Sequence, residues 1–488
     1  MKYDTPRKAV YSLLAILAGL CMALSACTPA VPQPVTTGST AAVSATTTQA
    51  ATTTTQAETT EAATVGTTAT AAPLTTGAPA TTTNAPPVPP VIPAEHKPVE
   101  AQEVEELPAP KPAPEAGDAA ALDCTPGKLP YAPLPASQYY AYNQLTAAQK
   151  GVYKEMRAYA QDMQPGGYIK QECVNSDLLR AYEALLTDYP QFFWLSHSFV
   201  YSSDEEGKLV YFQLEHRRYG VDYICTKEEA LKIAAQMKAK IAGIFSGISP
   251  ALTEFERELY LHDWICDNAE YEDKAVTDAN GHLYAFSSYG AFVGGRIVCE
   301  GYSRALQLLC YYAGIQCTLV TGNTLRLTGR PDYSAHHMWN IVRIDGIWGY
   351  TDATWNDEGL RLGGANQTSR RWFNIPEDEL RYDHYIDNAF PLPSADSFDA
   401  TWFAVKGQLL AEGQPADAFI RGLAAETAKE GGQYAEMLSA APGAVNAQRL
   451  MWTLNTADSR AQISAGLEDP IGRLYIERRS ARYCLVHW

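Results

Sequence analysis

Between Thr28 and about Pro90 the sequence consists almost wholly of Thr, Ala, Ser, Pro and Val, and Pro-rich and acidic residues continue it to Asp123. This segment has no apolar periodicity, so it cannot bury enough surface to offset the entropy lost on ordering. We therefore expect residues 28–123 to form a disordered tether. Folded sequence then begins near Tyr131 and leaves room for two or three domains in the 488-residue chain.

The first residues predict export. Three basic residues within the first eight positions precede an apolar stretch of about sixteen residues, which is shorter than the roughly twenty that span a bilayer. The stretch ends in Leu24-Ser25-Ala26-Cys27, which resembles a bacterial lipobox, where the Cys is lipidated and becomes the mature N-terminus. We predict a lipoprotein signal peptide over 1–27, lipidated at Cys27 and anchored to the cell membrane. An ordinary cleaved signal peptide and a short anchor helix are the alternatives, and all three place the rest outside the cytoplasm.

Composition and motifs exclude several classes of function. The formal net charge of −17 and the pI near 5.0 argue against a nucleic-acid partner, because phosphate binding needs a basic face. The sequence has no P-loop, Rossmann glycine pattern, His-Glu-x-x-His or Gly-x-Ser-x-Gly motif, and no Cys or His spacing typical of zinc. We expect neither metal nor cofactor. Cys310 and Cys317 could form a disulfide, with buried free thiols as the default interpretation.

The flanking regions predict accessory structure. Residues 131–250 are expected to form an α+β module, and 389–488 a C-terminal region of unassigned role. The expected helices lie over about 146–161 (opened by a Thr146–Gln149 capping box), 178–186, 227–245, 253–268 and 417–440, the last broken at Gly431-Gly432. The expected strands lie over 192–201 and 209–214, with a strand or hairpin over 474–487. Glu254, Glu256 and Glu258 are predicted to form a solvated helix face.

Cys299 is predicted to start a helix. The apolar residues that follow it, from Tyr302 to Ala313, fall on one helical face, and Gly314 stands where a glycine commonly ends a helix. The unpaired N–H groups and the positive end of the helix dipole favour a thiolate at this position. The same N–H groups could stabilise an oxyanion on an attacked carbonyl. A packed small residue is the alternative interpretation of a Cys at such a place.

His337 and Asp352 are predicted to share one face of a β-hairpin. Residues 337–344 alternate as a strand, Asp345-Gly346 favours a two-residue turn, and 347–352 return. This register makes His337 and Asp352 diagonal neighbours, about 7–8 Å apart along the backbone, so that the carboxylate can orient the imidazole. His336 then points to the opposite face. A core hairpin with a surface Asp and a hydrogen-bonded His is the alternative.

These segments together resemble the transglutaminase-like superfamily. The similarity rests on Cys299-Glu300-Gly301-Tyr302, His337-Met338-Trp339-Asn340 and Asp352-Ala353-Thr354-Trp355, with weaker similarity around Leu261 to Tyr271, at Phe373-Asn374 and at His384. The resemblance implies an α+β fold with a papain-like core over residues 251–388, in which the nucleophile helix packs on an antiparallel sheet. It also implies a catalytic triad of Cys299 as nucleophile, His337 as general base and acid, and Asp352 as orienting carboxylate. Tyr271 matches the position that completes the oxyanion hole in the family, and Trp264 is the second choice.

Such a triad acts on amide bonds through a Cys acyl-enzyme, and the next nucleophile decides the product. Water gives a peptidase or deamidase, which we favour slightly because the sequence shows no means of excluding water. An amine gives a cross-linking transglutaminase, and a catalytically silent surface binding module is the alternative of another class. The expected partners are peptides, proteins or cell-wall peptides at the cell surface, and we expect a monomer.

Overall fold

The computed structural model describes residues 100–104, 122–203, 210–215, 221–277, 279–325, 331–358, 360–362, 365–465, 467 and 470–488. The predicted signal peptide, Cys27 and most of the predicted tether lie outside these residues. None of the helices in the described ranges combines the length and the apolar composition needed to cross a bilayer.

The first part of the fold is a four-stranded sheet with helices, in the strand order β1-β3-β4-β2. Its strands are β1 (Glu100–Glu103), β2 (Gly166–Ile169), β3 (Ser198–Ser203) and β4 (Val210–Gln213), and its helices are η2 (Ala136–Gln138), α2 (Tyr140–Asn143), α3 (Ala147–Gln161) and α4 (Asn175–Asp188). The predicted capping box at the start of α3 is confirmed, with Thr146 and Gln149 exchanging hydrogen bonds.

Two predictions in this part are wrong. Glu100–Glu103, placed within the tether, form β1, which pairs in parallel with β3; backbone pairing at a sheet edge does not require apolar side chains. The strand predicted over 192–201 begins only at Ser198, because the buried aromatic run Phe192–Trp194 lies in turns. A short apolar run indicates burial without specifying the backbone conformation.

Two long helices lead into the central part, α5 (Lys227–Ser246) and α6 (Glu254–Asn268), and both begin with a capping box. The solvated face predicted for Glu254, Glu256 and Glu258 is wrong at Glu258, which is fully buried. Its carboxyl group accepts hydrogen bonds from the Thr351 hydroxyl (3.1 Å) and the Asn374 amide (2.5 Å). These partners come from distant segments, so helical periodicity alone could not reveal them.

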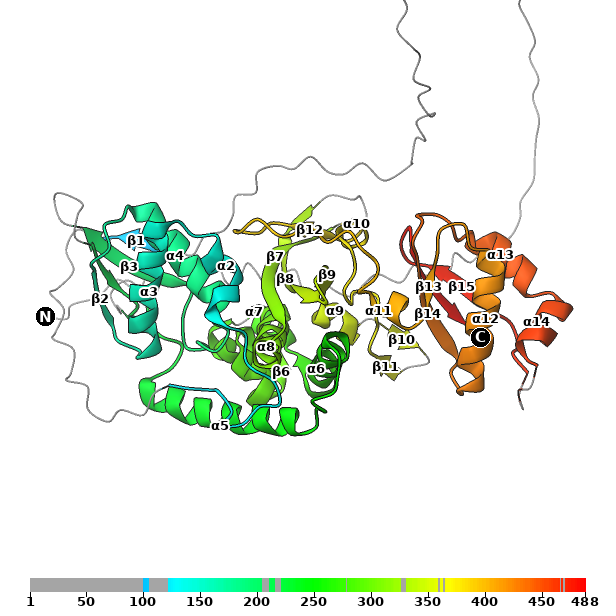
Figure 1. The fold of residues 1–488 in the computed structure, drawn as a ribbon, viewed down its shortest axis with the longest axis horizontal. Coiled ribbons are helices and arrows are strands. Elements are labelled where there is room, and N and C mark those ends of the chain that lie inside the picture. Colours follow the sequence, from blue (N-terminus) through cyan, green and yellow to red (C-terminus); the bar gives the residue numbers. More distant parts are fainter. Residues whose placement is uncertain are drawn as a thin grey trace, which may run out of the picture. The chain divides into compact units, whose positions relative to one another are not determined.

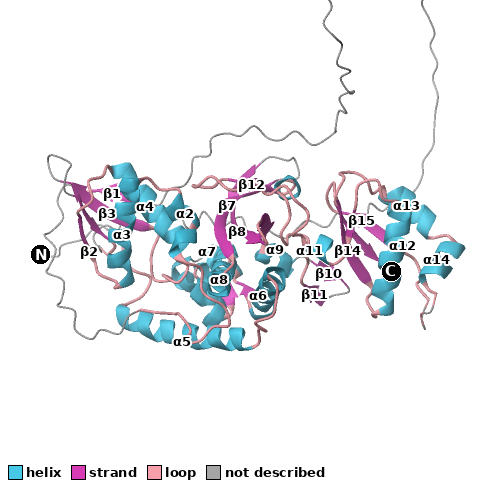
Figure 2. Ribbon diagram, in the orientation of Figure 1, coloured by secondary structure: helices cyan, strands magenta, loops and turns pink. Residues whose placement is uncertain are grey.

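The central sheet has the order β12-β7-β8-β9 and is wholly antiparallel (Figure 2). It is formed by β7 (Gln316–Leu325), β8 (Pro331–Ile344), β9 (Ile347–Thr351) and β12 (His384–Ile386). Helix α8 (Cys299–Ala313) packs against β7 and β8 (Figure 1). Shorter elements surround this core: β5 (Glu270–Tyr271), α7 (Asp273–Thr277), η4 (Ala279–Phe286), η5 (Gly290–Gly294), β6 (Arg296–Ile297), α9 (Ala353–Glu358), β10 (Leu360–Leu362), β11 (Ala365–Gln367) and α10 (Glu377–Leu380).

The C-terminal part has a sheet of its own, in the order β13-β14-β16-β15. Its elements are α11 (Trp402–Val405), β13 (Leu409–Leu410), α12 (Ala416–Lys429), β14 (Tyr434–Ser439), α13 (Ala447–Leu454), α14 (Ala457–Ile463), β15 (Tyr475–Arg478) and β16 (Tyr483–His487). The predicted terminal hairpin is confirmed. The helix predicted over 417–440 ends at Lys429; beyond the glycines the chain forms the central strand β14, where β16 supplies the backbone partners.

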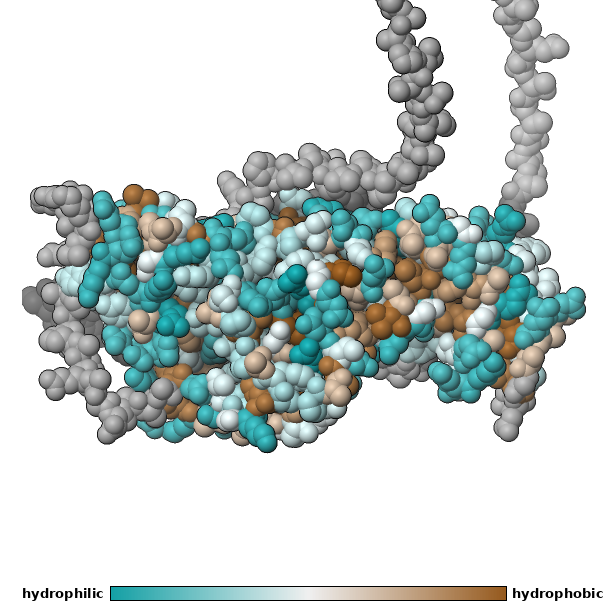
Figure 3. Space-filling view, in the orientation of Figure 1, coloured by the Kyte–Doolittle hydropathy of each residue, from teal (hydrophilic) through white to brown (hydrophobic). Residues whose placement is uncertain are grey.

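Large apolar side chains that remain exposed are spread over separate segments, and Figure 3 shows apolar and polar side chains intermingled on one face. They are Val174, Leu283, Val293, Tyr382, Val405, Trp452 and Tyr475.

Candidate active site

Cys299 is the first residue of α8, as predicted, and it is buried. Val298 at the N-cap offers no side-chain acceptor to the first N–H groups of the helix. These groups and the helix dipole therefore act on the Cys299 thiol and on any oxyanion formed beside it. The helix ends as predicted at Gly314, which has a left-handed φ of 73°.

Gly301 permits the close packing at the start of α8. A Cβ atom at this position would stand 2.4 Å from the carbonyl oxygen of Ala285. The same oxygen accepts the N–H of Val298, the residue before the cysteine (3.0 Å). A glycine is thus needed two positions after Cys299 because the backbone of residue 285 holds the entry to the helix.

Glu300 ties the start of α8 to the N-terminal sheet region. Its carboxylate accepts hydrogen bonds from Arg304 (2.7 Å) and contacts the imidazole of His197 (3.0 Å). Burial raises the pKa of Glu300, but His197 and Arg304 outweigh burial and lower it to about 2. The Arg304 guanidinium also donates to the carbonyl of Leu186 in α4 (3.0 Å). The N-terminal part of the fold therefore helps to fix the helix that carries Cys299.

The hairpin that carries His337 has the predicted register. Ile344 pairs with Ile347 across a turn in which Asp345 and Gly346 both have positive φ (49° and 90°). The pairing continues to Asn340 and Thr351, so that Asp352 follows the last paired residue. Instead of continuing as a strand, Asp352 stands directly before α9, and its carboxylate accepts the N–H of Trp355 (3.1 Å).

His337 and Asp352 are joined by a short hydrogen bond, as their diagonal placement predicts. His337 Nε2 donates to Asp352 Oδ2 at 2.6 Å, and both side chains are almost fully buried. Burial lowers the pKa of His337, but Asp352 and then Cys299 outweigh burial and raise it to about 9. Burial raises the pKa of Asp352, but His337 and His384 outweigh burial and hold it far below its ordinary value. The pair is therefore an imidazolium beside a carboxylate near neutral pH.

Cys299 is the second group that raises the pKa of His337. Nε2 of His337 is committed to the carboxylate, and the buried Nδ1 has no hydrogen bond of normal geometry among the described residues. The thiol nevertheless contributes both a charge and a hydrogen bond to the raised pKa of His337. Such a contact is often long before substrate binds and tightens in the reacting complex.

Two side chains fix the distance between the nucleophile helix and the hairpin. The amide of Asn340 donates to the carbonyl of Ser303 (3.0 Å), and the Ser303 hydroxyl lies 2.9 Å from both the Cys299 and Met338 carbonyls. All of these groups are buried or partly buried. The Asn of the His-x-Trp-Asn motif thus has a structural role, holding α8 against β8.

His384 is a further functional candidate, to which the sequence alone assigned no role. Its Nε2 donates to Asp352 Oδ2 (3.1 Å), and its Nδ1 donates to Asp383 (2.6 Å), so both ring nitrogens face carboxylates. Burial lowers the pKa of His384, but Asp352 and Asp383 outweigh burial and raise it to about 9. Arg371 in turn pairs with Asp383 (2.6 Å). The β12–β7 pairing that places His384 is a long-range contact with no local sequence signal.

Indole rings enclose these hydrogen bonds. Trp355 lies 5.5 Å from the His337 ring and 4.4 Å from the His384 ring, and Trp339 lies 4.8 Å from His384, measured between centroids. Excluding water in this way strengthens the electrostatic interactions between the buried groups.

The same three side chains form a group that could hold a metal ion. The donor atoms of His337, Asp352 and His384 lie within 4.8 Å of one another. Both histidines already donate to one oxygen of Asp352, so an ion would have to replace two hydrogen bonds. In the structure these three side chains satisfy one another through hydrogen bonds.

The oxyanion candidates differ in position. Tyr271 in β5 pairs with Ile297 of β6, two residues before Cys299, and packs against the small cluster of Ala275, Ala285 and Val298. It also lines a cavity of about 300 Å³ whose other walls include Asp267, Glu270 and Asp357. Trp264 instead stacks on Phe292, with centroids 5.8 Å apart. Position therefore favours Tyr271 over Trp264.

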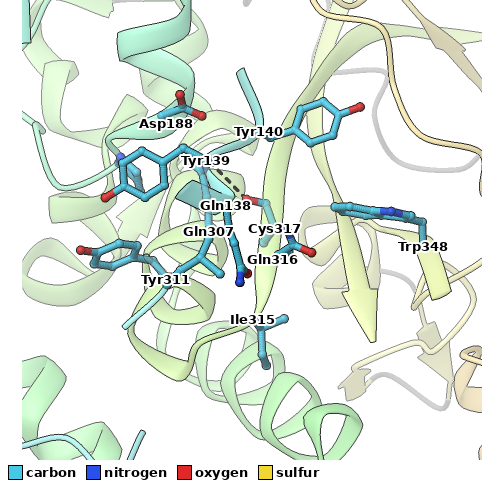
Figure 4. A pocket seen from close by; sticks show the side chains of 12 residues that line it. Gln138, Tyr139, Tyr140, Asp188, Gln307, Tyr311, Ile315, Gln316, Cys317 and Trp348 are labelled. Carbon is cyan, nitrogen blue, oxygen red and sulfur yellow. Dashed lines mark hydrogen bonds between the residues drawn. The ribbon is translucent and has the colours of Figure 1, made fainter. Parts of the chain in front are cut away.

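His336 lies outside this arrangement, as the hairpin register predicts. It is half-buried, and its Nδ1 accepts from the Asn323 amide (3.3 Å). Figure 4 shows a second, smaller pocket at the other end of α8, lined by residues that include Tyr139, Gln307 and Trp348. Its volume of about 20 Å³ suits a water molecule rather than a substrate.

The comparisons with known proteins cover part of the chain. Residues 242–353 match the Transglutaminase-like superfamily. Kyphoscoliosis peptidase of Mus musculus is 29% identical over 155 residues, which are 29% of this chain and 22% of that protein. Kyphoscoliosis peptidase of Homo sapiens is 30% identical over 131 residues, 25% of this chain and 19% of that protein. The chain thus spans about a fifth of the length of these relatives. A crystal structure of a TGase, 14% identical, covers 36% of this chain and 55% of its own, with a TM-score of 0.23.

Proposed function

Because residues 242–353 form a domain of the transglutaminase-like superfamily, we propose that the protein is a cysteine enzyme that acts on amide bonds of peptides or proteins. The observation that carries the proposal is the placement of His337 between Asp352, at 2.6 Å, and the thiol of Cys299 at a helix N-terminus. A thiolate paired with an imidazolium is the nucleophile that such chemistry requires.

The reaction proceeds in two steps. The Cys299 thiolate attacks the carbonyl carbon of a substrate amide and forms a carbon–sulfur bond, while the carbonyl oxygen takes up the negative charge. His337 then gives its proton to the departing amine as the carbon–nitrogen bond breaks, leaving a thioester on Cys299. Asp352 keeps the imidazole in place and stabilises its charged form throughout.

The negative oxygen needs donors that are already in position. The N–H groups in the first turn of α8 supply them, with the Tyr271 hydroxyl as the proposed second donor. Tyr271 is favoured because its strand pairs with Ile297, two residues before Cys299. These groups are part of the framework, so little reorganisation is needed when the charge forms.

Water is the second nucleophile that we favour, which makes the protein a peptidase or deamidase. His337 takes a proton from water, the hydroxide attacks the thioester, and the acid is released with the thiol restored. The peptidase name of the two curated relatives points the same way. An amine in place of water would give cross-linking by the same triad.

We further propose that the enzyme is exported and held at the cell membrane by lipid on Cys27. The support is the basic region, short apolar stretch and lipobox-like motif at the start of the chain. The Thr- and Pro-rich tether would then carry the folded part away from the bilayer. This location makes surface proteins and cell-wall peptides the expected substrates.

Alkylation by iodoacetamide at pH 6 tests the active thiol, with the labelled cysteines identified by peptide mapping. Cys299 should react at least tenfold faster than Cys317, the half-buried cysteine of the same chain, because only a thiolate reacts readily. His337→Ala should remove this advantage. His336→Ala, next to it on the other face of β8, should leave the rate unchanged. Equal reactivity of Cys299 and Cys317 would instead indicate a silent binding module.

Casein incubated with a fluorescent primary amine separates the two enzyme reactions. Hydrolysis produces new peptide termini or deamidated glutamine, whereas cross-linking attaches the amine to the protein. Both products should disappear in Cys299→Ala. Incorporation of the amine without hydrolysis would overturn the preference for water.

A further inference from the structure

The part of the chain after the central sheet contacts the groups that surround Asp352. Residues 389–488 lie outside the segment that matches the superfamily, and their sheet, β13-β14-β16-β15, has its own apolar core. Between this sheet region and residues 369–384, however, the contact is formed by buried polar groups. This segment carries Arg371, Asp383 and His384, so the contact bears directly on the site.

Glu436 on β14 is the centre of the contact. Its side chain is buried, and its carboxylate accepts hydrogen bonds from the Ser369 hydroxyl (2.7 Å), the Arg370 backbone N–H (2.9 Å) and the Tyr483 hydroxyl (2.6 Å). Two of these donors belong to the central part and one to β16. A buried carboxylate is destabilising unless hydrogen-bond donors surround it, so the turn at 369–370 and the C-terminal sheet depend on each other.

From this turn a chain of contacts leads to Asp352. The N–H of Arg371 donates to the Ser369 hydroxyl (3.0 Å), and its guanidinium pairs with Asp383 (2.6 Å) and lies 5.2 Å from the Tyr483 ring. Asp383 accepts from His384, and His384 donates to Asp352. Tyr483 therefore touches both Glu436 and Arg371.

A second pair of contacts holds the same segment. Ser480, in the turn before β16, donates to buried Glu379 of α10 (2.5 Å), and Arg482 pairs with Asp378. The segment that leads to Asp383 and His384 is thus fixed at both ends by residues of the C-terminal sheet.

We propose that residues 389–488 act as a positioning domain for the active site, in which Glu436 and Tyr483 fix the 369–371 turn so that Arg371 and Asp383 hold His384 against Asp352. The proposal rests on the proposed function, because it assigns these residues a role through the triad. Glu436 and Tyr483 are positioning residues; neither touches the reacting atoms.

Matched substitutions in the full-length protein test this role. Glu436→Leu removes the acceptor at similar size, and Tyr483→Phe removes one hydroxyl donor while keeping the ring on Arg371. The control is Glu477→Leu, because Glu477 is a carboxylate of the same sheet that bonds to Arg479 and His487, which are both C-terminal. Casein hydrolysis gives kcat and KM, and thermal unfolding verifies that each variant is folded.

A misplaced Asp352 should slow the chemical step without weakening substrate binding. We expect kcat to fall about 10- to 100-fold in Glu436→Leu and about 3- to 10-fold in Tyr483→Phe, with KM changed less than about twofold. Glu477→Leu should match the unmodified protein. If the two test variants fold and retain the kcat of Glu477→Leu, the positioning role is overturned. If Glu436→Leu does not fold, Tyr483→Phe decides alone.

Proton NMR provides a readout that does not require turnover. The short hydrogen bonds of His384 and His337 to carboxylates should give low-field N–H signals, which His384→Gln assigns. These signals should shift or broaden in Glu436→Leu and Tyr483→Phe and stay in place in Glu477→Leu. Unchanged signals in all three variants would refute the positioning role. An unreactive Cys299 in the unmodified protein would refute the proposed function alone, because the NMR comparison would still report on the contact.

Discussion

Among the individual residues, Asp352 is bound by the largest number of partners in the site. One carboxylate oxygen accepts from two imidazoles, and the other accepts the N–H of Trp355 in the first turn of α9. Burial would raise the pKa of this carboxyl, and the two histidines offset that effect. Asp352 therefore orients His337, and its own carboxylate is held by three donors: His337, His384 and the N–H of Trp355.

Replacing Asp352 should separate catalysis from folding. Asp352→Ala leaves His337 free to rotate and removes the charge that stabilises its imidazolium, so turnover should fall by roughly three to four orders of magnitude. Circular dichroism should show the fold retained, and casein hydrolysis measures the loss. Turnover within tenfold of the unmodified protein would remove Asp352 from the triad.

The burial of Glu258 predicts that the free energy of unfolding depends on pH. Burial raises its pKa to about 8, although hydrogen bonds from Asn374 and Thr351 lower it. The folded state then binds a proton that the unfolded state loses above about pH 4.5, so this group's contribution falls as pH rises from about 4.5 through 8. Glu258→Gln removes the titration, and its one amide oxygen keeps one of the two hydrogen bonds. The loss of the other hydrogen bond is the same at every pH, so between pH 5 and pH 8 the free energy of unfolding should rise relative to that of the unmodified protein by at most about 5 kcal/mol.

Urea unfolding at pH 5 and pH 8 measures this difference. Glu412→Gln, at an exposed loop position, should give the same curve as the unmodified protein at both values. A constant difference between Glu258→Gln and the unmodified protein across this range would show that Glu258 titrates normally.

At the level of elements, helix α8 and the β8–β9 hairpin were both predictable, for different reasons. The helix has an apolar face and a terminal glycine, and the Asp345-Gly346 turn fixes the register that makes His337 and Asp352 neighbours. These are local rules of backbone geometry. The approach of Ala285 to Gly301 and of Asn340 to Ser303 involves separate segments and became visible only in the fold.

Gly301→Ala tests the packing at the start of α8. The added Cβ would stand 2.4 Å from the Ala285 carbonyl oxygen, so the helix entry must shift, and we expect a lower melting temperature and slower alkylation of Cys299. Gly243→Ala in α5 is the matched control, because nothing lies within 4 Å of its Cβ. It should raise stability by about 0.5–1 kcal/mol. Unchanged Cys299 reactivity in Gly301→Ala would show that the close approach has no part in placing the thiol.

For the whole molecule, the contacts join three sheet-containing parts around one site. The N-terminal part holds Glu300 at the start of α8 through His197, and the C-terminal part reaches the turn before Arg371 through Glu436. The central part alone contains the proposed triad. The two flanking parts therefore contact residues on either side of the proposed triad.

Cys27→Ser tests the proposed anchor. Without the thiol the chain cannot receive the thioether-linked lipid, so the protein should move from the membrane fraction to the soluble extracytoplasmic fraction, or keep its signal peptide. Immunoblots of fractionated cells measure this shift, and Cys21→Ser, within the apolar stretch, is the control. Membrane retention of a Cys27→Ser chain cleaved before residue 27 would rule out lipid as the anchor.

The sequence by itself determined the fold class, the nucleophile helix and the hairpin register, because periodicity, capping and turn chemistry act over a few residues. It also supplied the candidate residues Cys299, His337 and Asp352. Only the tertiary structure decided the burial of Glu258, the second histidine at Asp352 and the contact made by Glu436. Each of these depends on polar partners more than 30 residues away, and no local pattern records which distant donor will satisfy a buried carboxylate.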